Sequence, residues 1–231
     1  MPHLPVLVFD FDGTVALGEG PVMAYGRSVA EQLAEPARGA LLASLAESLC
    51  PVSPADSAAR DGYDRVRTLA LAVGADDHSL RAGYAHSRAA LGLAAAPIRP
   101  PAGLAAFLTE HAGIARRVLV TNAPSTRLPE ALALLGLASG FDEVFTDAGK
   151  PDGFPALLAT LGAEAPLVSI GDVWENDLAP AQAAGFHTAL VGGRRPAEAT
   201  PDLSGESVTD LLPALTAWVR NPTQPLASAR A

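Results

Sequence analysis

Short apolar runs alternate with stretches of helical period along most of this chain. The first run, residues 4–9, is almost entirely apolar, which is typical of a strand buried on both faces of a parallel sheet. After residue 116, further runs predict strands at 117–121, 143–146, 167–171 and 187–191, and the intervening stretches predict helices at 125–135, 152–161, 176–184 and 207–219. This alternation indicates an α/β fold, in which helices cover both faces of a parallel sheet.

The segment from residue 18 to about residue 93 has a different pattern. Four amphipathic helices are predicted there, at 22–34, 37–49, 56–73 and 76–93, with prolines or glycine between them. A proline-rich connection follows at residues 97–101 before strands resume. We therefore expect a small all-helical domain, residues 18–97, inserted into a catalytic core formed by residues 1–17 and 98–220. Residues 221–231 are expected to be a flexible tail.

Composition limits the classes of partner. The chain has 231 residues, of which 49% are hydrophobic and 18% charged, so it can form one good core and a smaller satellite domain. A net charge of −9 and a pI of 4.9 argue against nucleic acid and anionic membranes as partners. The remaining expectation is a small-molecule partner, with the chain acting as a monomer or homodimer.

Cysteine content and hydropathy bear on the compartment. Cys50 is the single cysteine, which excludes an intramolecular disulfide and a cysteine-based metal site. The sequence shows neither a basic leader with an apolar centre nor an apolar run long enough to cross a bilayer. A cytoplasmic location is therefore expected.

Two carboxylates follow the first predicted strand directly. Asp10 and Asp12 stand in the segment Asp10-Phe11-Asp12-Gly13-Thr14, beyond the carboxyl end of that strand, where open α/β sheets bind their ligands. Residues two apart on an extended chain point the same way, so both acids can face one site. Neighbouring carboxylates repel each other unless they share a cation or a proton. The pair therefore indicates a catalytic or ligand-binding site at this turn.

Polar residues also follow the next predicted strands. Thr121 ends the strand at 117–121 and Asn122 follows it, at a position where a hydroxyl and backbone N–H groups can hold phosphate oxygens. Lys150 follows the strand at 143–146 and is the only lysine among 16 basic residues. A compact ammonium can neutralise a phosphate or a carboxylate where a planar guanidinium would not fit.

Another acid-bearing segment follows the strand at 167–171. Asp172 stands at the end of that strand, and Asp177 begins the helix after it. Together with Asp10 and Asp12, Asp172 completes a set of hard oxygen ligands suited to Mg²⁺.

In order and spacing, these four segments resemble the motifs of the haloacid dehalogenase superfamily, and the stretch 149–185 is similar to its small phosphatases, those related to phosphoglycolate phosphatase. The resemblance extends from about residue 6 to residue 219. It implies a Rossmann-like three-layer α/β/α core with a C1-type helical cap. Minor departures are Pro101 in place of an aromatic residue and Val173 in place of serine or threonine.

The resemblance also implies a mechanism, a Mg²⁺-dependent phosphatase reaction on a small phosphorylated metabolite. Asp10 would attack phosphorus to form an aspartyl-phosphate, and Asp12 would act as acid and then base. The metal ligands would be the Asp10 carboxylate, the Asp12 carbonyl and the Asp172 carboxylate. The remaining roles are phosphate binding by Thr121, Asn122 and Lys150, and orientation of Lys150 by Asp177.

Alternative functions stay open at this point. A sugar phosphomutase of the same family and a catalytically silent phosphate-binding module would both keep this pocket. A signalling receiver domain also uses an acid pair, a Thr and a Lys, but its acceptor aspartate follows the third strand. Family dehalogenases lack the second acid, which is present here as Asp12.

Overall fold

The computed structural model describes residues 4–48, 59–192 and 195–226, and in it the chain divides into two compact units. The first, the core unit, comprises Met1–Leu17, Arg99–Ser125 and Leu132–Ala231; the second, the helical unit, comprises Gly18–Ile98 and Thr126–Ala131. The short piece Thr126–Ala131 lies outside the segment expected to form the inserted domain. One boundary between the units therefore falls inside helix α6, Leu128–Leu134.

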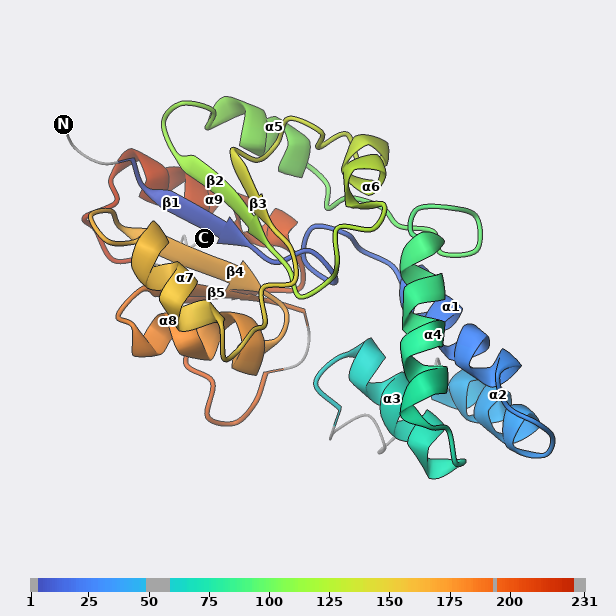
Figure 1. The fold of residues 1–231 in the computed structure, drawn as a ribbon. Helices are drawn as coiled ribbons and strands as arrows, with labels where there is room; N and C mark the ends of the chain where they lie inside the picture. Colours follow the sequence, from blue (N-terminus) through green and yellow to red (C-terminus); the bar gives the residue numbers. More distant parts are fainter. Residues whose placement is uncertain (1–3, 49–58, 193–194, 227–231) are drawn as a thin grey trace. The chain divides into compact units, whose positions relative to one another are not determined.

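The core unit is built on a six-stranded parallel sheet (Figure 1). Its strand order is β3-β2-β1-β4-β5-β6, so β1 lies in the interior between two strands that come much later in the sequence. The strands are β1 (Val6–Phe9), β2 (Arg116–Val120), β3 (Glu143–Phe145), β4 (Leu167–Gly171), β5 (His187–Val191) and β6 (Leu203–Gly205). The α/β fold expected from the sequence is confirmed, and β6 is an additional edge strand that the pattern did not predict.

Strand register decides where the polar residues lie. Phe9 at the end of β1 pairs with Leu119 of β2 and with Ile170 of β4. The residues that follow these positions therefore leave the sheet at the same edge. This is the edge at which parallel α/β sheets place their ligands.

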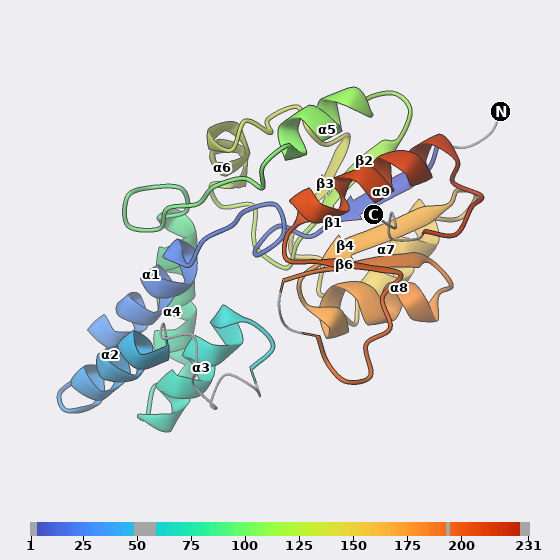
Figure 2. The same cartoon turned by 180° about the vertical axis from the view of Figure 1, so that it is seen from behind.

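Helices cover both faces of the sheet (Figures 1 and 2). On one face lie α7 (Phe154–Leu161) and α8 (Ala179–Ala183), and on the other lie α5 (Leu104–Glu110) and α9 (Val208–Arg220). The helix α5 was not predicted from the sequence. Helix α9 begins at a capping box in which the Ser207 side chain accepts from the Thr209 N–H while Asp210 accepts from the Ser207 N–H.

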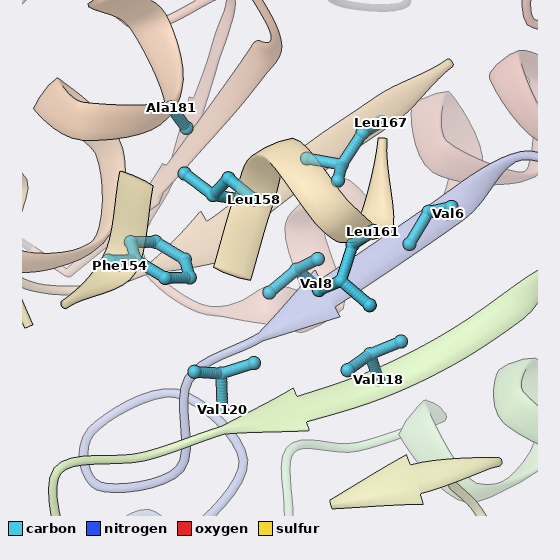
Figure 3. Close-up of a cluster of buried hydrophobic side chains, with 9 residues drawn as sticks. All are labelled: Val6, Val8, Val118, Val120, Phe154, Leu158, Leu161, Leu167 and Ala181. Carbon is cyan, nitrogen blue, oxygen red and sulfur yellow. The ribbon is translucent and has the colours of Figure 1, made fainter. Parts of the chain in front are cut away.

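The core between α7 and the sheet follows the period-2 alternation of the strands (Figure 3). Alternate valines of β1 and β2 point to the α7 side, where Phe154, Leu158 and Leu161 cover them. The four strand residues are Val6, Val8, Val118 and Val120. This packing fixes β1 and β2, and the polar residues that follow these strands at the edge of the sheet are positioned by it.

The helical unit contains the four helices expected from the sequence pattern. They are α1 (Gly20–Glu31), α2 (Ala37–Ser48), α3 (Gly62–Ala72) and α4 (Asp77–Ala89). Helix α3 begins later than the predicted residue 56, because the Asp61 side chain accepts from the Asp64 N–H and caps the helix. Residues 56–58 lie outside the described residues.

The C-terminal segment is described only in part. After α9, the Gln224 N–H donates to the Asn221 carbonyl oxygen, and Leu226 is buried. Residues 227–231 of the expected flexible tail lie outside the described residues. Within the described parts of the chain, no helix has the length and apolar character needed to cross a bilayer.

Leu158 offers a test of this packing. Leu158 is fully buried in the core beneath α7, so Leu158→Ala should lower the free energy of unfolding by about 2–5 kcal/mol through lost burial and a residual cavity. Leu134, a helical leucine that is 59% exposed, supplies the control, and Leu134→Ala should change stability by less than about 0.5 kcal/mol. Urea unfolding measures both. Equal losses at the two positions would contradict the assigned packing.

Candidate active site

Three carboxylates converge at the carboxyl edge of the sheet. Asp10, Asp172 and Asp177 each offer an oxygen, and these oxygens lie within 4.8 Å of one another. Asp10 follows β1 directly, and its N–H donates to the Ile170 carbonyl oxygen of β4 at 2.9 Å. Asp172 follows β4, so the strand register brings it beside Asp10.

The turn that carries Asp12 folds back on itself immediately after Asp10. The Ala16 N–H donates to the Phe11 carbonyl oxygen at 2.8 Å, and the Gly13 N–H donates to the Ala16 carbonyl oxygen at 3.0 Å. Asp12 is half-buried in this turn, and its carboxylate is not among the three that converge. Its expected roles, as a proton donor and as a carbonyl ligand, stay predictions.

Lys150 lies between two of the acids. Its Nζ donates to Asp10 Oδ1 at 2.7 Å, to Asp177 Oδ1 at 2.6 Å and to the Val120 carbonyl oxygen at 2.9 Å. The Lys150 side chain is only 3% exposed. All three donors of the ammonium group thus have acceptors within the protein.

Asn122 holds the backbone of Lys150 from both sides. Its Oδ1 accepts from the Lys150 N–H at 2.6 Å, and its Nδ2 donates to the Lys150 carbonyl oxygen at 2.9 Å. The sequence indicated a phosphate contact for Asn122, and that role stays a prediction. The contact seen instead is structural, because it ties the loop after β3 to the end of β2.

Thr121 occupies the end of β2 as expected. It is buried, and its Oγ1 accepts from the Ala123 N–H at 3.0 Å within the turn that follows the strand. The Thr121 backbone is also fixed, since its N–H donates to the Phe145 carbonyl oxygen and its own carbonyl accepts from the Ala148 N–H. Its expected contact with phosphate stays a prediction.

Asp177 is held by the segment that follows Asp172. The sequence predicted a regular helix from residue 176, but the structure has a π-helix, η2 (Trp174–Leu178), before α8. The Val173 N–H donates to Asp177 Oδ2 at 3.1 Å, and Ser169 Oγ donates to the Asp177 carbonyl oxygen at 2.8 Å. Single π-helical turns occur frequently at functional sites, where they displace one side chain from the regular helical pattern.

Burial and charge act together on Asp10 and Lys150. Burial raises the pKa of Asp10 to about 7, with further upward contributions from Asp177 and Asp12, while Lys150 opposes them. Burial works to lower the pKa of Lys150, but Asp10 and Asp177 outweigh it and raise that pKa above its ordinary value. Lys150 therefore remains a cation, and Asp10 holds its proton up to a higher pH than an ordinary carboxyl group does.

The donor set fits a hard divalent cation. Carboxylate oxygens are the ligands that Mg²⁺ and Ca²⁺ prefer, and three converge here. Both oxygens of Asp177 already accept hydrogen bonds, from Lys150 and from the Val173 N–H. Asp10 and Asp172 are therefore the better-placed metal ligands among the three.

The family of the chain follows from comparison of its sequence with family models. The model of haloacid dehalogenase-like hydrolases matches residues 4–185, which include the acids and the lysine of this site. The chain belongs to the haloacid dehalogenase (HAD)-like hydrolases. Among curated proteins, no sequence is significantly similar to it.

Solved structures with the same fold come from several branches of this family. A predicted phosphoglycolate phosphatase from Haemophilus somnus has a TM-score of 0.60 at 16% identity, over 92% of this chain and 98% of its own. The HAD-hydrolase YfnB from Bacillus subtilis, solved with magnesium, has a TM-score of 0.60 at 17% identity, over 93% and 99%. The L-2-haloacid dehalogenase from Xanthobacter autotrophicus has a TM-score of 0.55 at 18% identity, over 93% and 99%. At these identities, the likeness establishes the fold.

Sequence reasoning missed several groups that hold the site. The Val120 carbonyl and the Val173 N–H belong to the backbone, so no residue type marks them. Ser169 was counted only as part of a buried strand. A polar residue in an otherwise apolar strand next to the acids was the signal that could have identified it.

The raised pKa of Asp10 predicts a pH-dependent stability. The folded protein holds this proton more tightly than the unfolded chain, so the stabilisation is complete below the ordinary pKa of 3.8 and is lost as the pH rises towards 7. Asn at this position does not titrate. With chelator present, the free energy of unfolding of Asp10→Asn should therefore rise relative to that of wild type by up to about 3 kcal/mol as the pH is raised from about 5 to about 8. Denaturant unfolding at several pH values measures this. Parallel pH profiles for the two proteins would show that burial of Asp10 does not perturb its titration.

Proposed function

We propose that this chain is a Mg²⁺-dependent phosphomonoester hydrolase that forms an aspartyl-phosphate on Asp10 and acts on a small phosphorylated metabolite. The observation that carries the proposal is the buried pair of Asp10 and Lys150, with Nζ 2.7 Å from Oδ1, at the edge of the sheet where Asp172 also emerges. A carboxylate held beside a cation, with a second acid two residues away, fits covalent phosphoryl transfer.

Each acid has a distinct role in the proposed reaction. An oxygen of Asp10 attacks phosphorus, the bond from phosphorus to the ester oxygen breaks, and Asp12 gives its proton to the leaving alcohol. Asp12 then takes a proton from water, whose oxygen attacks the same phosphorus. The bond to Asp10 breaks, which releases inorganic phosphate and restores the carboxylate.

Positive charge at the site is supplied by Lys150 and by a metal ion. The carboxylates of Asp10 and Asp172 and the Asp12 carbonyl would hold Mg²⁺, which would offset the repulsion between an attacking carboxylate and a phosphate. Lys150 favours the ionised form of Asp10 against the effect of burial and adds a fixed cation, which Asp177 orients. The Thr121 hydroxyl is proposed to bind a non-bridging phosphate oxygen.

Asp12 favours phosphatase over dehalogenase chemistry within this family. Dehalogenation by carboxylate attack releases halide, which needs no proton, whereas an alkoxide leaving group does. The solved structures of similar fold include a predicted phosphatase and a dehalogenase alike, so this choice rests on Asp12. A sugar phosphomutase would use these residues too, and it would return the phosphoryl group to a sugar instead of releasing phosphate.

Release of phosphate tests the proposal. The purified protein should hydrolyse p-nitrophenyl phosphate and members of a phosphorylated-metabolite panel with Mg²⁺, lose this activity with chelator, and regain it when Mg²⁺ is restored. Asp10→Asn should lower kcat at least about a thousandfold, because an amide cannot attack phosphorus. Asp12→Asn should lower kcat by about 10²–10⁴-fold, and most strongly for alkyl phosphates, whose leaving groups need the proton.

The matched control is Asp152→Asn, at an exposed aspartate of the Lys150 loop, which should retain wild-type kinetics. Chelator-insensitive turnover would overturn the metal requirement. Turnover by Asp10→Asn would overturn the nucleophile assignment. Sugar phosphate isomerisation without phosphate release would identify the phosphomutase instead.

Lys150 provides a separate prediction about shape. Its three donors meet three fixed acceptors in a site where the side chain is 3% exposed, and a planar guanidinium is too wide to replace it there. Lys150→Arg should therefore lower kcat by about a hundredfold although the charge is retained, since a misplacement of about 1 Å can have that effect. Steady-state kinetics measure this. Near-wild-type kcat would mean that charge alone is required at this position.

A further inference from the structure

Gly171, the last residue of β4, lies directly against the side chain of Asp177. A Cβ atom at position 171 would lie 2.5 Å from both Cβ and Oδ2 of Asp177, and 2.6 Å from its Cγ. These separations are about 1 Å shorter than ordinary contact between carbon atoms. A side chain at position 171 and the present position of Asp177 are therefore incompatible.

Asp177 has little freedom to move aside. Its two carboxylate oxygens accept from Lys150 Nζ and from the Val173 N–H, and its carbonyl accepts from Ser169 Oγ. The Asp177 side chain is 4% exposed, so there is no solvent-facing position for it to adopt without breaking these bonds. Any displacement of Asp177 therefore changes its ion pair with Lys150.

The same relation recurs at the neighbouring acid. A Cβ atom at Gly13 would lie 2.7 Å from Asp172 Cγ and would overlap its Oδ2. Gly13 also has a φ of 84°, so a substitution there combines backbone strain with the clash. Gly171 is not among the glycines of positive φ, which makes it the cleaner position to test.

We propose that Gly171 is a positioning residue: it leaves the space in which the Asp177 carboxylate reaches Lys150, and through Lys150 it sets the place of Asp10. The contact chain runs from Gly171 to Asp177, from Asp177 Oδ1 to Lys150 Nζ at 2.6 Å, and from Nζ to Asp10 Oδ1 at 2.7 Å. Its effect on catalysis rests on the proposed phosphatase reaction, but its effect on Lys150 does not.

The single lysine of the chain makes this chain of contacts measurable. Selective ¹³C,¹⁵N-lysine labelling gives one set of NMR signals, from Lys150. These signals can be recorded whether or not the protein has enzymatic activity. Gly171→Ala should shift the Lys150 side-chain signals in the same direction as Asp177→Asn does, because both weaken the same ion pair. Gly171→Ala should also lower kcat by roughly tenfold to a hundredfold while KM changes much less.

Two comparisons separate positioning from a general effect of the added methyl group. Gly39 lies in an exposed turn of α2 near only the flexible end of Glu35, so Gly39→Ala should leave the Lys150 signals and kcat unchanged. In an Asp177→Gly background, which lacks the atoms that clash, Gly171→Ala should produce no further shift of the Lys150 signals.

Each outcome decides the proposal. Wild-type Lys150 signals and kcat in Gly171→Ala would overturn it, as would an undiminished shift in the Asp177→Gly background. If Gly171→Ala fails to fold, the added Asp177→Gly exchange should restore folding, and a failure to do so would also overturn it. Shifted Lys150 signals in a protein that hydrolyses no phosphate ester would leave the positioning role standing and remove the proposed function.

Discussion

The interaction on which this site depends is the buried ammonium group of Lys150 between two carboxylates. Three acids with oxygens within 4.8 Å of one another repel strongly in a buried environment, and without a cation at least one of them would have to take up a proton. Lys150 Nζ supplies that charge and contacts Asp10 and Asp177 at 2.7 and 2.6 Å. The arrangement is favourable only because all three ammonium donors find acceptors. A buried charge that lacks partners costs roughly several kcal/mol.

Backbone groups and one side-chain amide hold this cation and its two carboxylates in place. The Val120 carbonyl takes the third donor, the Asn122 amide holds the Lys150 main chain, and the Val173 N–H fixes the second oxygen of Asp177. All of these groups leave the sheet at the ends of β2 and β4, which flank β1 in strand order. The site is thus assembled by strand register, and the valine and leucine packing beneath α7 that fixes the register contributes to function through geometry.

The features that could be predicted from the sequence are those that depend on the type of residue. Buried strands and the acids that follow them were readable, because apolar runs and carboxylates are conspicuous. Strand β6 was missed because two of its three residues, Ser204 and Gly205, are types that are common in turns, and α5 because its seven residues follow a proline-rich connection. Helix α6 starts at Leu128 instead of residue 125, since Arg127 has a φ of 55°. The π-turn at Trp174–Leu178 depends on hydrogen bonds that no local pattern specifies.

Glycine shows most clearly what residue types do not reveal. Reading a sequence for chemistry singles out groups that donate, accept or carry charge, whereas Gly13 and Gly171 contribute by having no side chain where Asp172 and Asp177 need room. Carboxylates that share one cation must lie close together, and this requires that the neighbouring backbone come close to their side chains. The same reasoning applies to Lys150, whose compact ammonium fits a position that the fifteen arginines of this chain could not occupy. In this fold the space at the sheet edge therefore limits where charged groups can lie. The glycines there determine whether a carboxylate can reach its place beside the lysine.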